Sequence, residues 1–136
     1  MLPTWILLAV GGALGTLARY AVSIGIQAAL PVAWVQYPAG TLGVNIVGCL
    51  LIGLLMGLSG GLGLNGPKLA EPARLLLVTG FLGGFTTFSS YALELSRLFS
   101  MSSPVAWVQA IGYLVLSNGL GVAAVFLGNW LGRIPY

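Results

Sequence analysis

Charged side chains are so sparse in this chain that long stretches of it carry none. The 136 residues include five lysines and arginines, two acidic residues and no histidine, so only 5% are charged. A soluble domain carries about 25% charged residues, which cover its surface. The charged positions are Arg19, Lys68, Glu71, Arg74, Glu94, Arg97 and Arg133. Because the stretches between them can hold the roughly 20 apolar residues that cross a bilayer as a helix, the sequence predicts an integral membrane protein.

Four apolar segments are predicted to be transmembrane helices, since a span in hydrocarbon must satisfy its own backbone hydrogen bonds. Their expected limits are about 4–27, 39–58, 73–99 and 104–132, where prolines and glycine-rich stretches interrupt the apolar runs. No segment shows the alternating pattern of a β-barrel strand. The apolar N-terminus lacks the basic start of a signal peptide and is interpreted as the first helix. The predicted fold is all-α, with a single transmembrane domain over residues 1–136.

The residue types that are missing exclude several kinds of site. The net charge of +3 is scattered along the chain, so it does not indicate a surface for nucleic acid. Cys49 is the only cysteine, which excludes an internal disulfide and a cysteine-based metal cage. The absence of histidine excludes imidazole catalysis and imidazole metal ligation. No ATP-binding motif and no catalytic group are visible, so the chain is not expected to be an enzyme.

Glycine is abundant inside the predicted helices, with 21 residues in the chain. Three pairs have the four-residue spacing that places both glycines on one helix face: Gly11 and Gly15, Gly53 and Gly57, and Gly80 and Gly84. Small residues at this spacing let membrane helices approach closely. The pattern predicts close helix packing and, because one small four-helix unit offers little interior, tight oligomerisation.

The cations are divided weakly between the two sides of the membrane. With four spans, Lys68, Arg74 and Arg133 fall on the side of the N-terminus, whereas Arg97 falls on the opposite side and Arg19 lies toward it. Short loops normally carry a clear excess of lysine and arginine on the cytoplasmic side. The weak bias suggests the hypothesis that the subunit inserts in both orientations and pairs with itself in an antiparallel homodimer.

Polar residues within the spans are candidates for function, because they are costly in a membrane. Thr41 and Asn45 share one face of the second helix, and Tyr113 and Ser117, with Asn118 adjacent, lie on the fourth. Arg19 interrupts the first helix.

The third helix is the most polar span, with Gly-Gly-Phe-Thr-Thr-Phe-Ser-Ser-Tyr over residues 83–91 followed by Glu94. Paired glycines and competing hydroxyls predict that this run is not a plain helix, and broken helices at membrane depth can bind ions. Hydroxyl and amide donors such as Thr87, together with the positive ring edges of Phe88 and Tyr91, suit a small anion.

The run Gly-Phe-Leu-Gly-Gly-Phe-Thr-Thr-Phe-Ser at residues 80–89 resembles the third-helix signature of the Fluc family, the CrcB-type fluoride channels. The first-helix segment 11–15 with Arg19, and the second-helix segment 40–48 with Asn45, are similar to that family as well. The resemblance implies a fluoride-selective channel that exports fluoride passively from the cytoplasm through the inner, or plasma, membrane of a prokaryote. It also implies an antiparallel dual-topology homodimer with two pores.

The resemblance further implies a structural sodium ion at the dimer centre, bound by the backbone carbonyls of Gly83 and Thr86 in both subunits. It places Asn45 and the aromatic pair Phe88 and Tyr91 in the pore, although the second aromatic residue of the family is usually phenylalanine.

The remaining pore residues carried over from the family come from three helices. Tyr113 and Ser117 form a polar track on the fourth helix, which continues to Gly121, where the family often has serine. Glu94 is expected near one end of the pore and Arg19 near its vestibule. Thr41 and Thr87, which the polar pattern within the spans and not the resemblance singles out, complete the candidate pore residues.

Two other functions remain open from the residues alone. A small proton-coupled multidrug exporter also has four helices and can pair antiparallel, but it needs a carboxylate deep in the membrane. The first helix has none, and Glu94 lies toward the end of the third. A non-transporting scaffold subunit would account for the glycines but not for the polar run in the third helix. Loss of fluoride flux on removing Asn45 would argue against the scaffold.

Overall fold

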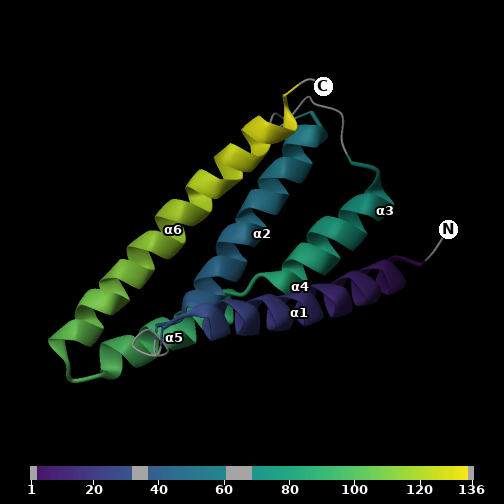
Figure 1. Cartoon of the computed structure of the whole chain (residues 1–136). Coiled ribbons are helices and arrows are strands. Elements are labelled where there is room, and N and C mark those ends of the chain that lie inside the picture. Colours follow the sequence, from purple (N-terminus) through teal and green to yellow (C-terminus); the bar gives the residue numbers. More distant parts are fainter. Residues whose placement is uncertain (1–2, 32–36, 61–68, 135–136) are drawn as a thin grey trace.

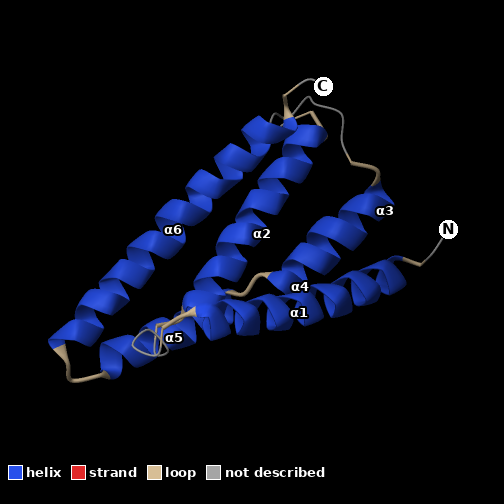
Figure 2. Ribbon diagram, in the orientation of Figure 1, coloured by secondary structure: helices blue, strands red, loops and turns tan. Residues whose placement is uncertain are grey.

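The computed structural model describes residues 3–31, 37–60 and 69–134, and the regular elements in these ranges are helices (Figure 2). Four helical stretches are long and apolar enough to cross a membrane: Thr4–Ala29, Ala39–Leu58, Glu71–Ser100 and Pro104–Gly132. The prediction of an all-helical protein with four helices able to cross a membrane is therefore confirmed. Lys68, one of the cations used to compare the two sides, lies outside the described residues.

Two of the spans differ from the sequence-based limits. Helix α1 (Thr4–Ala29) continues past the expected end at residue 27, and the third span covers Glu71–Ser100 rather than residues 73–99. Leu30 has extended backbone (φ −86°, ψ 147°), because the residue before a proline is disfavoured in the α conformation. At Glu71 the next residue, Pro72, lies in the first turn, where its missing N–H costs nothing.

The third span consists of several helical pieces. A short helix α3 (Glu71–Ala73) leads into a π-helix, η2 (Arg74–Leu82), and then into α4 (Gly83–Phe85). Thr86 (φ −84°, ψ 159°) and Thr87 (φ −149°, ψ 118°) have extended backbone, and α5 (Phe88–Ser100) follows them. The π-helix is a rare conformation, and the short π-helical turns found within α-helices are often located at functional sites.

The helices pack in two pairs, as Figure 1 shows. Helix α2 (Ala39–Leu58) runs beside α6 (Pro104–Gly132), and α1 runs beside η2 and α4. Helix α5 then returns toward α6. The described N- and C-terminal ends lie toward the same end of the bundle as α3, opposite the connection between α5 and α6.

Glycines form the closest contacts within each pair. A Cβ atom added to Gly128 on α6 would lie 2.8 Å from the backbone nitrogen of Leu54 on α2, and one added to Gly53 would overlap the carbonyl of Val125. In the other pair, a Cβ atom on Gly11 would lie 2.9 Å from the backbone nitrogen of Phe81. The helix backbones therefore touch directly, as small residues permit in membranes.

Apolar side chains cover the outside of the bundle as well as its interior. On α6, the exposed side chains include Val108, Phe126 and Trp130. The buried cluster instead contains two tyrosines, Tyr91 and Tyr113, packed with Leu98 and Ala110. An exterior as apolar as the interior is the arrangement expected of a chain whose solvent is lipid.

Candidate functional site

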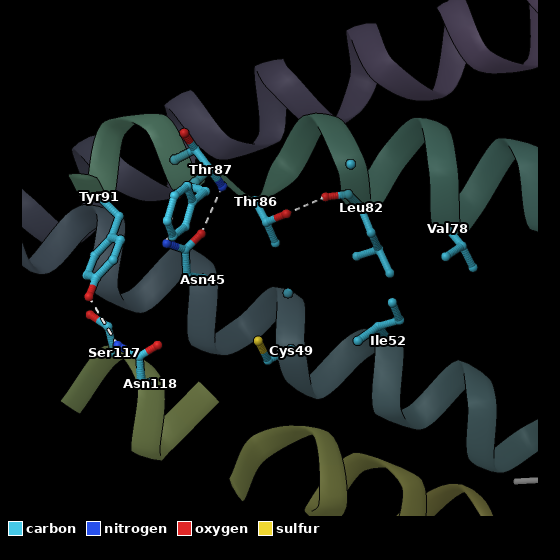
Figure 3. Close-up of a pocket in the computed structure, with 13 residues that line it drawn as sticks. Asn45, Cys49, Ile52, Val78, Leu82, Thr86, Thr87, Tyr91, Ser117 and Asn118 are labelled. Carbon is cyan, nitrogen blue, oxygen red and sulfur yellow. Dashed lines mark hydrogen bonds between the residues drawn. The ribbon is translucent and has the colours of Figure 1, made fainter. Parts of the chain in front are cut away.

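A cavity of about 400 Å³ lies where the extended residues of the third span face α2 and α6 (Figure 3). It brings together seven of the residues predicted from the sequence: Asn45, Gly83, Thr86, Thr87, Phe88, Tyr91 and Ser117. These residues come from three different helical spans, so the site exists only in the folded subunit. We call this cavity the central pocket.

Asn45 holds the extended segment in place. Its Nδ2 donates to the carbonyl of Thr87 at 3.0 Å, and its Oδ1 accepts from the N–H of Thr87 at 2.9 Å. Figure 3 shows the Asn45 side chain directed toward Thr87 from α2. Buried backbone groups that leave a helix must find other partners, and one asparagine side chain supplies both partners here. The second hydrogen of the Asn45 amide is not used in these two bonds.

Thr87 also begins the helix that follows. Its Oγ1 accepts from the backbone N–H of Ser90 at 3.2 Å, which makes Thr87 the N-cap of α5. In an unbroken α-helix, the N–H of Ser90 would donate to the carbonyl of Thr86, and the N–H of Thr87 would donate to the carbonyl of Gly83. Both N–H groups are engaged by side chains instead, so the carbonyls of Gly83 and Thr86 lose these α-helical partners.

Glu94 is the centre of a second polar cluster, in the next two turns of α5. Its Oε1 accepts from Thr41 Oγ1 at 2.7 Å, and its Oε2 accepts from Tyr113 Oη at 2.8 Å. The Tyr113 side chain is fully buried. The carboxylate therefore links α2, α5 and α6, and each of its oxygens accepts one hydrogen bond from a hydroxyl group.

Glu94, Thr41 and Arg19 line a second cavity, of about 350 Å³, which Thr87 also lines. The predicted site residues therefore fall into two neighbouring groups, with Thr87 common to both. Within the described ranges, the only ion pair joins Arg74 to Glu71 at 2.7 Å, so Arg19 and Glu94 are not paired although they line the same cavity. The resemblance implies that Glu94 lies near one end of a pore and Arg19 near its vestibule.

The aromatic residues of the site are in mutual contact. The ring centroids of Phe88 and Tyr91 lie 5.7 Å apart, and those of Tyr91 and Tyr113 lie 5.2 Å apart. Phe88 is 80% exposed, whereas Tyr91 is only 7% exposed. In this subunit Phe88 therefore projects outward from the break, while Tyr91 is held between α5 and α6.

Asn118 is a site residue that sequence reasoning noted only as a neighbour of Ser117. It lines the central pocket, and its Nδ2 donates to Tyr91 Oη at 3.1 Å (Figure 3). Asn118 directly follows Ser117 on the helix, and adjacent helical residues point in different directions. The sequence therefore gave no reason to expect both side chains at one pocket. Gly121, where the family often has serine, is buried, and a Cβ atom there would lie 3.5 Å from Cys49 Sγ.

The side chains of the described residues offer no ready-made metal cage. No group of three or more histidine, cysteine or acidic side chains lies close enough to hold a metal within those ranges. A cation at this site would therefore have to be bound by backbone carbonyls, and those of Gly83 and Thr86 are among the carbonyls that lose their helical partners at the break.

Comparison with known proteins agrees with the resemblance seen in the signature run. The family model described as "CrcB-like protein, Camphor Resistance (CrcB)" matches residues 6–129. The chain is 44% identical to a protein of Chloroflexus aurantiacus over 93% of this chain and 92% of the relative. It is 40% identical to one of Hyphomonas neptunium (95% and 94%) and 43% identical to one of Paracoccus denitrificans (96% and 94%). All three relatives are named fluoride-specific ion channel FluC. The chain therefore belongs to the CrcB-like protein family.

Proposed function

We propose that this protein is a fluoride-selective channel, which lets fluoride leave the cytoplasm through the inner membrane of a prokaryote and so relieves fluoride toxicity. The observation that carries the proposal is the central pocket, where hydroxyl and amide donors gather beside a break in the third span. The names of the relatives add the identity of the anion. No chemical step is required, and an inside-negative potential drives anions outward with about 2.3 kcal/mol per 100 mV.

The residues of the site would replace the hydration shell of the ion. Fluoride binds water tightly, so a selective path must offer hydrogen-bond donors and positive ring edges in its place. The spare N–H of Asn45, the hydroxyl of Ser117 and the edges of Phe88 and Tyr91 are of this kind. The second cavity, with Arg19, Thr41 and Glu94, would continue the path toward the vestibule, since Thr87 borders both cavities.

The test of this function is ion efflux from liposomes that contain the purified protein. A fluoride electrode should record rapid fluoride release, while liposomes loaded with chloride should release little. Release of neither ion from folded protein would contradict the channel and favour a scaffold subunit. Proton-driven transport of a cationic drug would instead favour the exporter, which would require Glu94 to exchange protons despite its bonds to Thr41 and Tyr113.

The functional unit that we propose is an antiparallel homodimer of subunits with dual topology. The exposed position of Phe88 beside the break supports a partner there, because a large aromatic side chain otherwise projects from the functional site. The weak charge bias supports insertion in both directions. Arg74 begins η2 directly after α3, Arg133 is the C-cap of α6, and Arg97 lies in the last turn of α5. Helix α3 and the C-terminal end of α6 lie toward one end of the bundle, and the connection from α5 to α6 lies at the other (Figure 1).

Dual topology predicts that a reporter at the C-terminus will be active on both sides of the membrane. A fluorescent reporter detects a cytoplasmic C-terminus, and a phosphatase reporter detects a periplasmic one. Comparable signals from both fusions are expected. Adding two lysines after Gly132 should shift the population toward one orientation. A single orientation in the unmodified chain would contradict the proposal.

We also propose that a sodium ion joins the two subunits at the break. The carbonyls of Gly83 and Thr86 would bind it, one pair from each subunit, and the ion would hold the two extended segments together. These two carbonyls suit this role because they have lost their α-helical donors. The N–H of Thr87 donates to Asn45 instead of Gly83, and the N–H of Ser90 donates to Thr87 Oγ1 instead of Thr86. Carbonyl oxygens can replace the hydration shell of a cation.

Sodium binding predicts a large effect of Gly83→Val on assembly but little effect on the subunit. A Cβ atom at Gly83 would meet only the carbonyl of Val78, at 3.9 Å, so the valine fits the subunit and obstructs an approaching ion. We expect at least a tenfold loss of efflux and of dimer, measured by flux and by cross-linking. Replacing sodium with N-methylglucamine should mimic the variant. Thr79→Val, at an exposed position nearby, should behave as the wild type, and unchanged dimers in Gly83→Val would contradict the site.

A further inference from the structure

The amide of Asn118 determines how the hydroxyl of Tyr91 can be used. Asn118 Nδ2 donates to the backbone carbonyl of Leu114 at 2.7 Å and to Tyr91 Oη at 3.1 Å. A carbonyl can only accept, so the nitrogen of the amide must face Leu114. The same nitrogen then donates its other hydrogen to Tyr91, whose hydroxyl oxygen is the acceptor.

The proton of the Tyr91 hydroxyl is therefore left for another partner. A phenol has one hydrogen to donate, and Asn118 Nδ2 cannot accept it. Within the described residues, no acceptor is found for this hydrogen. The ring itself is fixed, because it is 7% exposed and packs between Phe88 and Tyr113. Only rotation about the C–O bond remains, and the hydroxyl borders the central pocket.

A second hydroxyl at the same pocket, that of Ser117, also lacks an acceptor for its hydrogen among the described residues. The Oγ atom of Ser117 is buried and has no hydrogen-bond partner in the described part of the chain. Figure 3 shows Ser117 and Asn118 together beneath the Tyr91 hydroxyl, on the α6 side of the pocket. A buried hydroxyl without a partner costs stability, so an occupant that accepts hydrogen bonds would stabilise this wall of the pocket.

The pocket can be compared with the cluster around Glu94, where the hydroxyl hydrogens are already used. Tyr113 Oη donates to Glu94, and Thr41 Oγ1 does the same. Both hydrogens of the Asn118 amide are used as well, on Leu114 and Tyr91. Tyr91 and Ser117 are therefore the hydroxyl donors of this wall that remain available.

We propose that Tyr91 and Ser117 form a two-hydroxyl anion subsite, in which Asn118 is the positioning residue that turns the Tyr91 hydroxyl into a donor toward the ion. The inference rests on the proposed function, because it takes fluoride as the anion. It adds that the tyrosine of this chain binds the ion through its O–H and not only through the ring edge. Asn118 does not touch the ion; it acts through Tyr91.

The experiment is a double-mutant cycle read as fluoride efflux from liposomes. Tyr91→Phe should lower efflux about tenfold, because a hydrogen bond to a charged group is lost. Asn118→Leu should lower it about threefold, because the hydroxyl can then turn away from the ion. The double variant should match Tyr91→Phe alone, since Asn118 has nothing left to position. Gln109→Leu, on the same helix and away from the pocket, is the control and should leave efflux unchanged.

Asn118→Asp provides a second approach, which keeps a polar side chain of the same size at this position. The carboxylate can only accept, so it would take the Tyr91 proton and withdraw it from the ion. Adding Tyr91→Phe to this variant should therefore cause no further loss.

The subsite would be overturned if the fold-losses of efflux in the two single variants of either cycle multiplied in the double variant. Wild-type efflux in Asn118→Leu would overturn it as well. Either result would leave the proposed channel function intact. Absence of efflux from the folded wild-type protein would overturn the proposed function and this subsite together.

Discussion

Asn45→Leu is expected to lower fluoride efflux about a hundredfold. Leucine has nearly the same shape as asparagine, but it leaves the N–H and the carbonyl of Thr87 without the partners that Asn45 provides at 2.9 and 3.0 Å. Each unpaired buried group costs about 1–3 kcal/mol, so the extended segment should rearrange. The spare N–H that Asn45 offers to the pocket is lost at the same time. Efflux from liposomes measures the effect.

Asn45→Asp removes the donor side of Asn45 and keeps its acceptor side. Aspartate can still accept from the N–H of Thr87 but cannot donate to its carbonyl or to an anion, so its efflux should also be low. Ser59→Ala is a suitable control, because it removes a polar group on the same helix whose hydroxyl bonds only to Leu55 of its own helix, at 2.7 Å. Near-normal efflux from folded Asn45→Leu would show that the break does not depend on this side chain.

Gly128→Ala is expected to have the largest effect on folding. The added methyl group would meet the carbonyl of Leu50 and the backbone nitrogen of Leu54, so α2 and α6 would have to move apart. Overpacking a core costs about 1–3 kcal/mol even where side chains can adjust, and backbone atoms adjust less. We expect a tenfold or greater loss of monodisperse protein after purification, measured by size-exclusion chromatography.

Gly119→Ala is the matched control on the same helix. A Cβ atom there would meet nothing within 4 Å, and alanine favours a helix over glycine. Its yield should therefore equal that of the wild type. Equal losses from both variants would mean that α6 depends on its glycines for flexibility rather than for close approach to α2. No loss from Gly128→Ala would contradict the close packing itself.

The membrane spans and their packing residues could be predicted because they depend on composition and local spacing. A charge-free run of sufficient length has few stable alternatives to a membrane helix. Glycines four residues apart must lie on one face of any helix that forms. The same local argument predicted that residues 83–91 are not a plain helix, and Thr86 and Thr87 there have extended backbone. The roles of the site residues in ion transport remain predictions.

The partners of the polar side chains were decided by the tertiary structure. Nothing local to Asn45 indicates that it binds the backbone of Thr87, or that Glu94 accepts hydroxyls from Thr41 and Tyr113. Such bonds depend on the rotation and depth of each helix against its neighbours, which the backbone contacts of the glycines set. The π-helix of residues 74–82, whose backbone packs directly on α1, is likewise not predicted by helix propensity. Hydrophobic length is a property of the chain itself, whereas a hydrogen bond between helices exists only once their packing has brought donor and acceptor within reach.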